Sequence, residues 1–120
     1  MSRKTLVIGA SPNPERYAFK AVNALRAHGH QVVALGIRKG MIGDVPITLV
    51  PPEDPDFDTV TLYVGAPHQE QYAGLIFRMR PKRVIFNPGT ENPAFETRLA
   101  RAGIRAERAC TLVLLATNQF

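Results

Sequence analysis

The sequence predicts an α/β protein with a mostly parallel sheet that is covered by helices on both faces. Short apolar segments alternate with amphipathic segments along all 120 residues, as parallel strands alternate with crossover helices. The first apolar segment also stops at Gly9, and an amphipathic segment follows it closely, which is typical of a strand-to-helix turn. The length suits one compact domain, residues 1–120.

Residues 4–8 form the first predicted strand, and a helix follows it. The helix is expected from Pro14, or from Tyr17 at the latest, because apolar side chains then recur at helical spacing. Asn13 is expected to cap its N-terminus, and Gly29 is expected to end it.

Residues 31–35 form the second predicted strand. The connection after it, residues 37–58, holds several glycines and prolines, which exclude a regular helix. We expect an extended crossover there, with a short strand at residues 47–50. Residues 59–64 form the third predicted strand.

The second half of the chain repeats the alternation of helix and strand. A helix is predicted between Pro67 and Pro81, and residues 83–86 form the fourth strand. Asn92 is a good N-cap for a third helix, which ends before Gly103.

Residues 104–107 form the fifth predicted strand, and residues 111–115 pack as the last apolar segment. The sheet therefore has five strands or slightly more. In such sheets ligands bind beyond the carboxyl ends of the strands, where the strand order reverses. The loops expected at that edge are residues 9–16, 36–39, 65–67, 87–92 and 108–111.

The turn after the first strand carries the strongest functional signal. Gly9, Ala10 and Ser11 connect strand to helix, and the free backbone amides of such a turn favour an anion, usually a phosphate. The dinucleotide fingerprint G-x-G-x-x-G is absent, because Ser11 and Asn13 stand where its later glycines would fall. A phosphorylated ligand is expected, but not through that motif.

The end of the second strand narrows the choice of ligand. It lacks the Asp or Glu that binds an unmodified ribose diol, and it carries Arg38 and Lys39 instead. Two cations there suit a nucleotide with an extra ribose phosphate, such as coenzyme A or NADP, whereas NAD and FAD fit poorly. A solvated basic turn explains the two side chains equally well.

Composition argues against several other classes of function. The net charge of +5 comes from 15 Lys and Arg against 10 Asp and Glu, but the cations are scattered and no nucleic-acid-binding motif accompanies them. No apolar run is long enough to span a membrane, and the single cysteine excludes an internal disulfide, so a cytoplasmic protein is expected. No catalytic or metal-binding constellation is readable, which favours binding over catalysis.

Several segments together resemble the small stand-alone CoA-binding proteins, which are similar to the N-terminal domain of the succinyl-CoA synthetase alpha subunit. These segments are Val-Ile-Gly-Ala-Ser-Pro-Asn-Pro-Glu-Arg-Tyr (7–17), Gly-His-Gln-Val-Val-Ala-Leu-Gly-Ile-Arg-Lys-Gly (29–40), Asp-Thr-Val-Thr-Leu-Tyr-Val (58–64), Ile-Phe-Asn-Pro-Gly-Thr-Glu-Asn-Pro (85–93) and Ala-Cys-Thr-Leu-Val (109–113). The resemblance covers essentially the whole chain, in order. One departure is that the family commonly has Pro-Val-Asn-Pro-Lys after the second strand.

The resemblance implies a Rossmann-like three-layer domain that holds coenzyme A or an acyl-CoA at its strand ends, as a non-catalytic binding or regulatory module. The turn at Gly9, with Ala10, Ser11 and Asn13, would take the pyrophosphate. Arg16 matches a basic position of the family. The 3′-phosphate would lie near Ile37, with Arg38 or Lys39. The implied binding residues of the later loops are Gly65, Ala66, Pro67, Asn87, Pro88, Gly89 and Cys110.

Three alternatives stay open at this point. Cys110 is either a small buried side chain or a thiol close to the thiol end of the ligand, where a mixed disulfide with CoA is a hypothesis. The competing function is an NADP-binding oxidoreductase or sensor. A protein partner or a homo-oligomer is a further possibility for a regulatory or scaffold subunit.

Overall fold

The computed structural model describes residues 2–54 and 56–120, and within them seven strands form one sheet. Pro55 of the predicted connection and Met1 of the predicted domain lie outside the described residues. The strands are β1 (Thr5–Ala10), β2 (Val32–Gly36), β3 (Met41–Ile42), β4 (Val45–Thr48), β5 (Thr59–Leu62), β6 (Arg83–Phe86) and β7 (Arg105–Arg108). The helices are α1 (Tyr17–Ala27), α2 (Glu70–Met79), α3 (Pro93–Arg101) and α4 (Thr111–Ala116), with a short 3₁₀ helix η1 (Ala66–His68).

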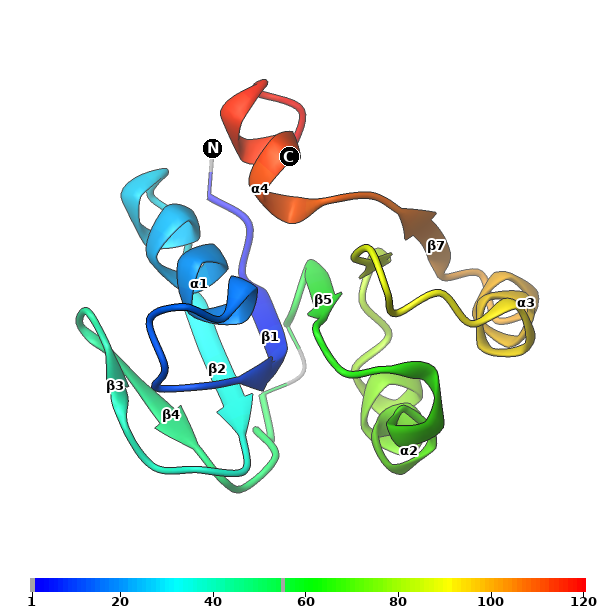
Figure 1. The fold of residues 1–120 in the computed structure, drawn as a ribbon. Coiled ribbons are helices and arrows are strands. Elements are labelled where there is room, and N and C mark those ends of the chain that lie inside the picture. Colours follow the sequence, from blue (N-terminus) through cyan, green and yellow to red (C-terminus); the bar gives the residue numbers. More distant parts are fainter. Residues whose placement is uncertain (1, 55) are drawn as a thin grey trace.

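The strand order is β3-β4-β2-β1-β5-β6-β7, and every neighbouring pair is parallel except β3 and β4 (Figure 1). The predicted Rossmann-like α/β fold is therefore confirmed, with a larger sheet than five strands. The order reverses at β1, because the chain passes from β1 to β2 on one side and later returns to β5 on the other. Ligands of such sheets bind at this reversal.

Two apolar cores lie on the two faces of the sheet. Leu6 and Ile8 of β1 pack with the buried side chains of α2 and α3, whereas Val7 and Ala10 pack with those of α1 and α4. Figure 1 shows the same division, with α1 and α4 on one side and α2 and α3 on the other. The arrangement is the three-layer sandwich that a buried parallel sheet requires.

A bulge near the end of β1 shapes the turn that follows. The register with β2 shifts between Ile8 and Ala10. Gly9 has a φ of 95°, a backbone conformation that residues with a side chain rarely adopt. A Cβ atom at Gly9 would also lie 2.9 Å from Cγ1 of Val64, closer than real Cβ contacts allow. Glycine is therefore required at this position by both the backbone conformation and the neighbouring loop.

Three features of the first half differ from the sequence prediction. The first helix begins at Tyr17 with Arg16 as its N-cap, because the Asn13 side chain instead accepts a hydrogen bond from the backbone of Glu15 at 3.0 Å and closes a tight turn. The short strand runs over Val45–Thr48 and not over residues 47–50, and β3 pairs with it as an antiparallel hairpin.

The remaining elements follow the prediction closely, with one addition. The predicted apolar segment at residues 111–115 lies in helix α4, Thr111–Ala116, which packs against α1. Gly29 and Gly103 end α1 and α3 with φ near 80°. Among the described residues, no helix has the length and apolar character needed to cross a membrane.

Candidate functional site

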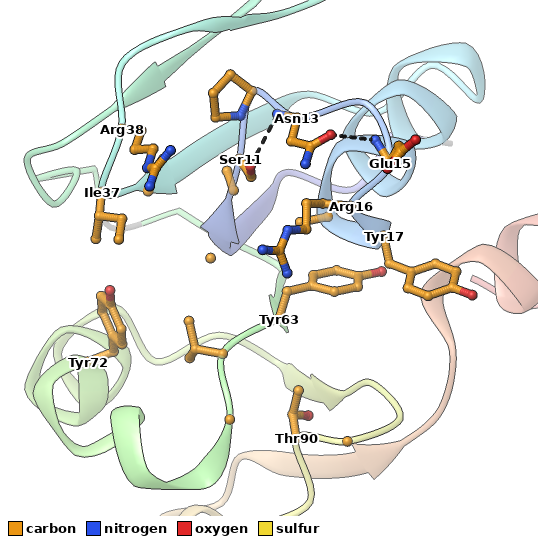
Figure 2. Close-up of a pocket in the computed structure, with 18 of the residues that line it drawn as sticks. Ser11, Asn13, Glu15, Arg16, Tyr17, Ile37, Arg38, Tyr63, Tyr72 and Thr90 are labelled. Atoms are coloured by element: carbon orange, nitrogen blue, oxygen red, sulfur yellow. Dashed lines mark hydrogen bonds between the residues drawn. The ribbon is translucent and has the colours of Figure 1, made fainter.

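A groove of about 690 Å³ lies at the carboxyl ends of β1, β2 and β5, where the strand order reverses (Figure 2). Four connections form its walls: the β1–α1 loop, the β2–β3 loop, the β5–α2 loop and the β6–α3 loop. Its volume lies in the range of small-molecule sites. The groove is therefore at the position that the predicted topology indicates for a ligand.

The end of β1 and the β1–α1 loop contribute more of the lining than any other segment. Five of the residues predicted to bind the ligand lie there: Gly9, Ala10, Ser11, Asn13 and Arg16. Two local hydrogen bonds hold the loop in shape. Ser11 Oγ accepts from the backbone of Asn13 at 3.1 Å, and Asn13 Oδ1 accepts from the backbone of Glu15 at 3.0 Å. The loop is thus held by contacts between its own residues.

Helix α1 starts directly on the groove. Tyr17 and Ala18, its first two residues, line the wall, and no side chain caps the N-terminus. The first backbone N–H groups of a helix have no partner inside the helix, and the helix dipole places positive charge there. This end of the groove therefore favours an anion.

The β2–β3 loop brings one of the two predicted cations to the groove. Ile37 and Arg38 line the wall, whereas Lys39 lies outside it. Ile37 is 84% exposed, which leaves a large apolar side chain uncovered at one end of the groove. In Figure 2 the Ile37 side chain faces Tyr72 of α2 across that end.

The β5–α2 and β6–α3 loops form the opposite wall. From the predicted residues, Gly65, Pro88 and Gly89 lie on the groove, whereas Ala66 and Pro67 turn away into η1. Val64 and Thr90 are further lining residues that the sequence analysis did not include. This wall carries no charged side chain among these residues.

Besides Lys39, Ala66 and Pro67, two more predicted site residues, Asn87 and Cys110, lie outside the lining. Asn87 is 2% exposed, and its carboxamide is used inside the protein: Nδ2 donates to Thr61 Oγ1 at 2.6 Å and to the Leu62 carbonyl, and Oδ1 accepts from the backbone of Thr111. Cys110 is a half-buried, free cysteine at the N-cap of α4, where the chain returns from β7 toward α1. The structure does not bring either side chain to the groove wall.

The tyrosines of the groove were not among the predicted site residues. The chain has three, and Tyr17, Tyr63 and Tyr72 all line the groove. Burial raises the pKa of Tyr63 to about 12, so its phenol remains protonated at neutral pH. Tyr17 offered a signal in the sequence, because it is an aromatic residue outside the apolar face of its helix. In the structure its side chain is 68% exposed.

In the part of the chain that the structure describes, the two arginines on the groove have no anionic partner. Within residues 2–54 and 56–120, neither Arg16 nor Arg38 takes part in an ion pair. Figure 2 shows the Arg16 side chain reaching into the groove above Tyr63. Glu15 is the one acidic residue on the lining, so the groove carries a net positive charge. Unpaired cations in a concave site attract anionic ligands.

The described part of the chain offers no metal site, since it contains no group of three His, Cys, Asp or Glu residues in a suitable arrangement. The lining carries one carboxylate, that of Glu15, and the hydroxyl groups of Ser11 and Thr90. The cations, apolar groups and aromatic groups of the groove together suit an anionic ligand.

Comparison with solved structures finds close relatives of this fold. A crystal structure of an uncharacterised protein matches with a TM-score of 0.96 and 41% identity, over 100% of this chain and 99% of that chain. A protein from Thermus thermophilus matches with a TM-score of 0.85 and 21% identity, over 99% and 91% of the two chains. A hypothetical protein from Pyrococcus horikoshii OT3 matches with a TM-score of 0.80 and 25% identity, over 93% of this chain and 80% of that chain.

Comparison with protein families gives a match over nearly the whole chain. The sequence pattern of the family described as the CoA binding domain matches residues 3–116. No curated protein matches the chain. The matched region includes all four connections that form the groove.

Proposed function

The chain belongs to the CoA-binding domain family, and on that premise we propose that it binds coenzyme A or an acyl-CoA in the groove at the strand ends. One observation carries the proposal. The groove combines the uncapped N-terminus of α1 with Arg16 and Arg38, two cations that pair with no acidic side chain in the described residues. A ligand with two separate phosphate groups matches this arrangement.

The diphosphate of the ligand belongs at the β1–α1 loop. The first amides of α1 lack side-chain acceptors, and Arg16 reaches into the groove beside them. Backbone amides at a helix N-terminus and an adjacent guanidinium are the usual groups that bind phosphates in proteins. The bulge at Gly9 supports this assignment, because it lets the backbone come close to a ligand without a side chain in the way.

The adenosine end belongs beside the β2–β3 loop. Ile37 and the hydroxyl end of Tyr72 face one another there, and an apolar and an aromatic side chain at one end of a groove suit a purine base. Arg38 follows Ile37 directly and lines the same end, where it can bind a ribose phosphate. NADP also carries such a phosphate, so it is the main competitor in the tests below.

The pantetheine arm belongs along the wall formed by Val64, Gly65, Gly89 and Thr90. This wall has no charged side chain, and pantetheine is an uncharged chain of amides and methylene groups. Exposed backbone groups of glycine-containing loops can hydrogen-bond to such amides. Tyr63 and Tyr17 then lie near the far end of the arm.

The role is that of a binding or regulatory module without catalysis of its own. The high pKa of Tyr63 keeps its phenol protonated, which argues against a general base, and Glu15 has no second carboxylate on the lining to work with. A regulatory module would report the presence of CoA to a partner chain or to a second copy.

Binding is tested by calorimetry and thermal shift with a panel of coenzyme A, acetyl-CoA, dephospho-CoA, NADP and NAD. A ligand that binds only the folded state raises the melting temperature, and the shift grows with ligand concentration. We expect CoA and acetyl-CoA to give the largest shifts, dephospho-CoA a smaller one and NAD none. A larger shift for NADP than for CoA would assign the groove to the competing function, and no shift with any of the five would refute both.

A further inference from the structure

The carboxamide of Gln69 is completely buried between two loops of the groove. Gln69 is the residue before α2, and its side chain has no exposed surface. Nε2 donates to the Val64 carbonyl at 3.0 Å and to the Thr90 carbonyl at 2.7 Å. Oε1 accepts from Asn92 Nδ2 at 3.0 Å. Both hydrogens of the amide group and its oxygen are therefore used.

These hydrogen bonds connect two segments that are far apart in the sequence. Val64 belongs to the β5–α2 loop and Thr90 to the β6–α3 loop, and both residues line the groove. The third partner, Asn92, accepts a hydrogen bond from the Phe95 backbone and so caps α3. Gln69 thus ties together the two loops of the uncharged wall and the start of the helix behind it.

The carbonyl groups explain why a glutamine is needed. Two backbone acceptors, of Val64 and Thr90, point at the same nitrogen, and a buried acceptor without a donor destabilises its surroundings. A carboxylate has no hydrogen to donate and would repel both carbonyl oxygens, and a hydrocarbon side chain would leave both oxygens without a hydrogen-bond donor. With the carboxamide in place, the spacing between the two loops has one preferred value.

We propose that Gln69 is a positioning residue for the pantetheine arm: it sets the spacing of the Val64–Gly65 and Gly89–Thr90 segments, between which the arm is held. This inference rests on the proposed CoA function and extends it. Gln69 touches no part of the ligand itself, since it does not line the groove. Its loss therefore acts on the arm and leaves the adenosine end, held by Ile37, Arg38 and Tyr72, largely unchanged.

The experiment compares two ligands on the intact chain by calorimetry. Coenzyme A carries the arm, whereas adenosine 3′,5′-bisphosphate keeps the nucleotide end and lacks it. In Gln69→Met, which has a similar shape but no amide, we expect the Kd for CoA to rise about tenfold or more. For the bisphosphate we expect the Kd of this variant to stay within about twofold of the wild-type Kd, because a distant substitution that removes no contact changes it by no more than that.

Ile76→Val is the matched control for a general loss of stability. Ile76 is completely buried in α2, the helix that follows Gln69, and it does not line the groove. We expect this variant to lower the melting temperature and to keep the wild-type affinity for both ligands. If Gln69→Met weakened both ligands equally, or neither, the positioning role would be refuted.

Gln69→Glu provides a second variant, in case Gln69→Met folds poorly. A neutral carboxylic acid can donate one hydrogen bond to a carbonyl, whereas a carboxylate can donate none. The affinity of this variant for CoA, relative to the wild type at the same pH, is therefore expected to improve as the pH falls. A ratio of the two affinities that stayed constant with pH would count against the inference.

The wild type separates the failure of this inference from the failure of the proposed function. If the wild type bound the bisphosphate but gained no affinity from the arm of CoA, the inference would fail while a nucleotide function remained. If it bound neither ligand, both proposals would fail.

Discussion

Gly36 lies so close to Ala10 that a side chain on Gly36 would collide with the Ala10 carbonyl oxygen. The two residues are partners across β1 and β2, at the end of the ladder where the bulge shifts the register. Both also line the groove. The floor of the site is therefore made by two backbones in direct contact, and this contact depends on the absence of a Cβ atom.

Gly36→Ala is expected to destabilise the protein, because the added methyl group meets a backbone carbonyl that cannot rotate away. Overpacking of this kind costs about 1–3 kcal/mol of the free energy of unfolding. Urea denaturation measures the loss, and calorimetry with CoA measures the accompanying damage to the groove, which we expect to weaken binding.

Gly74→Ala is the matched control for this substitution. Gly74 lies in α2, and a Cβ atom there would meet no atom within 4 Å. Alanine has a higher helix propensity than glycine, so this variant is expected to gain about 0.5–1 kcal/mol and to bind CoA normally. Equal effects of the two substitutions would contradict the close-approach argument.

The stability of the protein is expected to fall in mild acid because of His30. Burial is the main cause that lowers the pKa of the His30 imidazole, and its Nδ1 accepts a hydrogen bond from the Arg3 backbone at 2.9 Å, which requires an unprotonated nitrogen. In the unfolded chain the group titrates near 6.5, so below that pH the unfolded state binds the proton more readily than the folded state. The contribution of His30 to the free energy of unfolding is therefore fully present above the pKa of the unfolded chain, and it decreases as the pH falls below that pKa.

Thermal unfolding measured between about pH 7.5 and about pH 5.5 brackets this titration. We expect the melting temperature of the wild type to fall across the range, and His30→Gln to reduce that fall. His68→Gln, at an exposed position, should keep the wild-type slope. If the two variants had the same slope, His30 would not be the responsible group.

The strands and helices with regular apolar spacing could be predicted from the sequence, and the short elements could not. The fourth predicted strand, residues 83–86, has the same bounds as β6, because its apolar residues 84–86 stand between Pro81 and the turn at Asn87-Pro88. The hairpin of β3 and β4 was missed because β3 has only two residues, too few for a pattern. Helix α4 has six residues, and its apolar run fits a strand as well as a helix.

Some residues of the candidate site could likewise be predicted from the sequence, and others could not. The place of the turn after β1 on the groove could be predicted, because a strand that stops at a glycine before a helix is a local pattern. The choice between Arg38 and Lys39 depends on which side chain faces the groove, and neighbouring loop residues give no local signal for this. Asn87 was expected at the ligand, but its carboxamide pairs with residues 61, 62 and 111, which are distant in the sequence. Gln69 was missed for the same reason.

Asn92→Ala is expected to destabilise α3 and the wall in front of it. Asn92 Oδ1 accepts from the Phe95 backbone at 3.2 Å as the N-cap, and loss of such a cap costs about 0.5–2 kcal/mol. The substitution also removes the hydrogen bond to Gln69. Urea denaturation is the measurement. Thr97→Ala, at an exposed position of the same helix, should change the free energy of unfolding by less, and an equal loss would rule out a special role for Asn92.

Arg38→Gln is expected to discriminate between ligands that differ in one phosphate. Arg38 lines the end of the groove that we propose for the adenosine, and it has no acidic partner in the described residues. The proposed function therefore pairs Arg38 with the 3′-phosphate. Loss of a charged hydrogen bond of this type costs about 1.5–3 kcal/mol, or roughly tenfold or more in Kd. Calorimetry should show this loss for CoA and almost none for dephospho-CoA. Lys39→Gln, outside the lining, is the control and should leave both affinities unchanged; a larger effect at Lys39 than at Arg38 would move the phosphate to the neighbouring side chain.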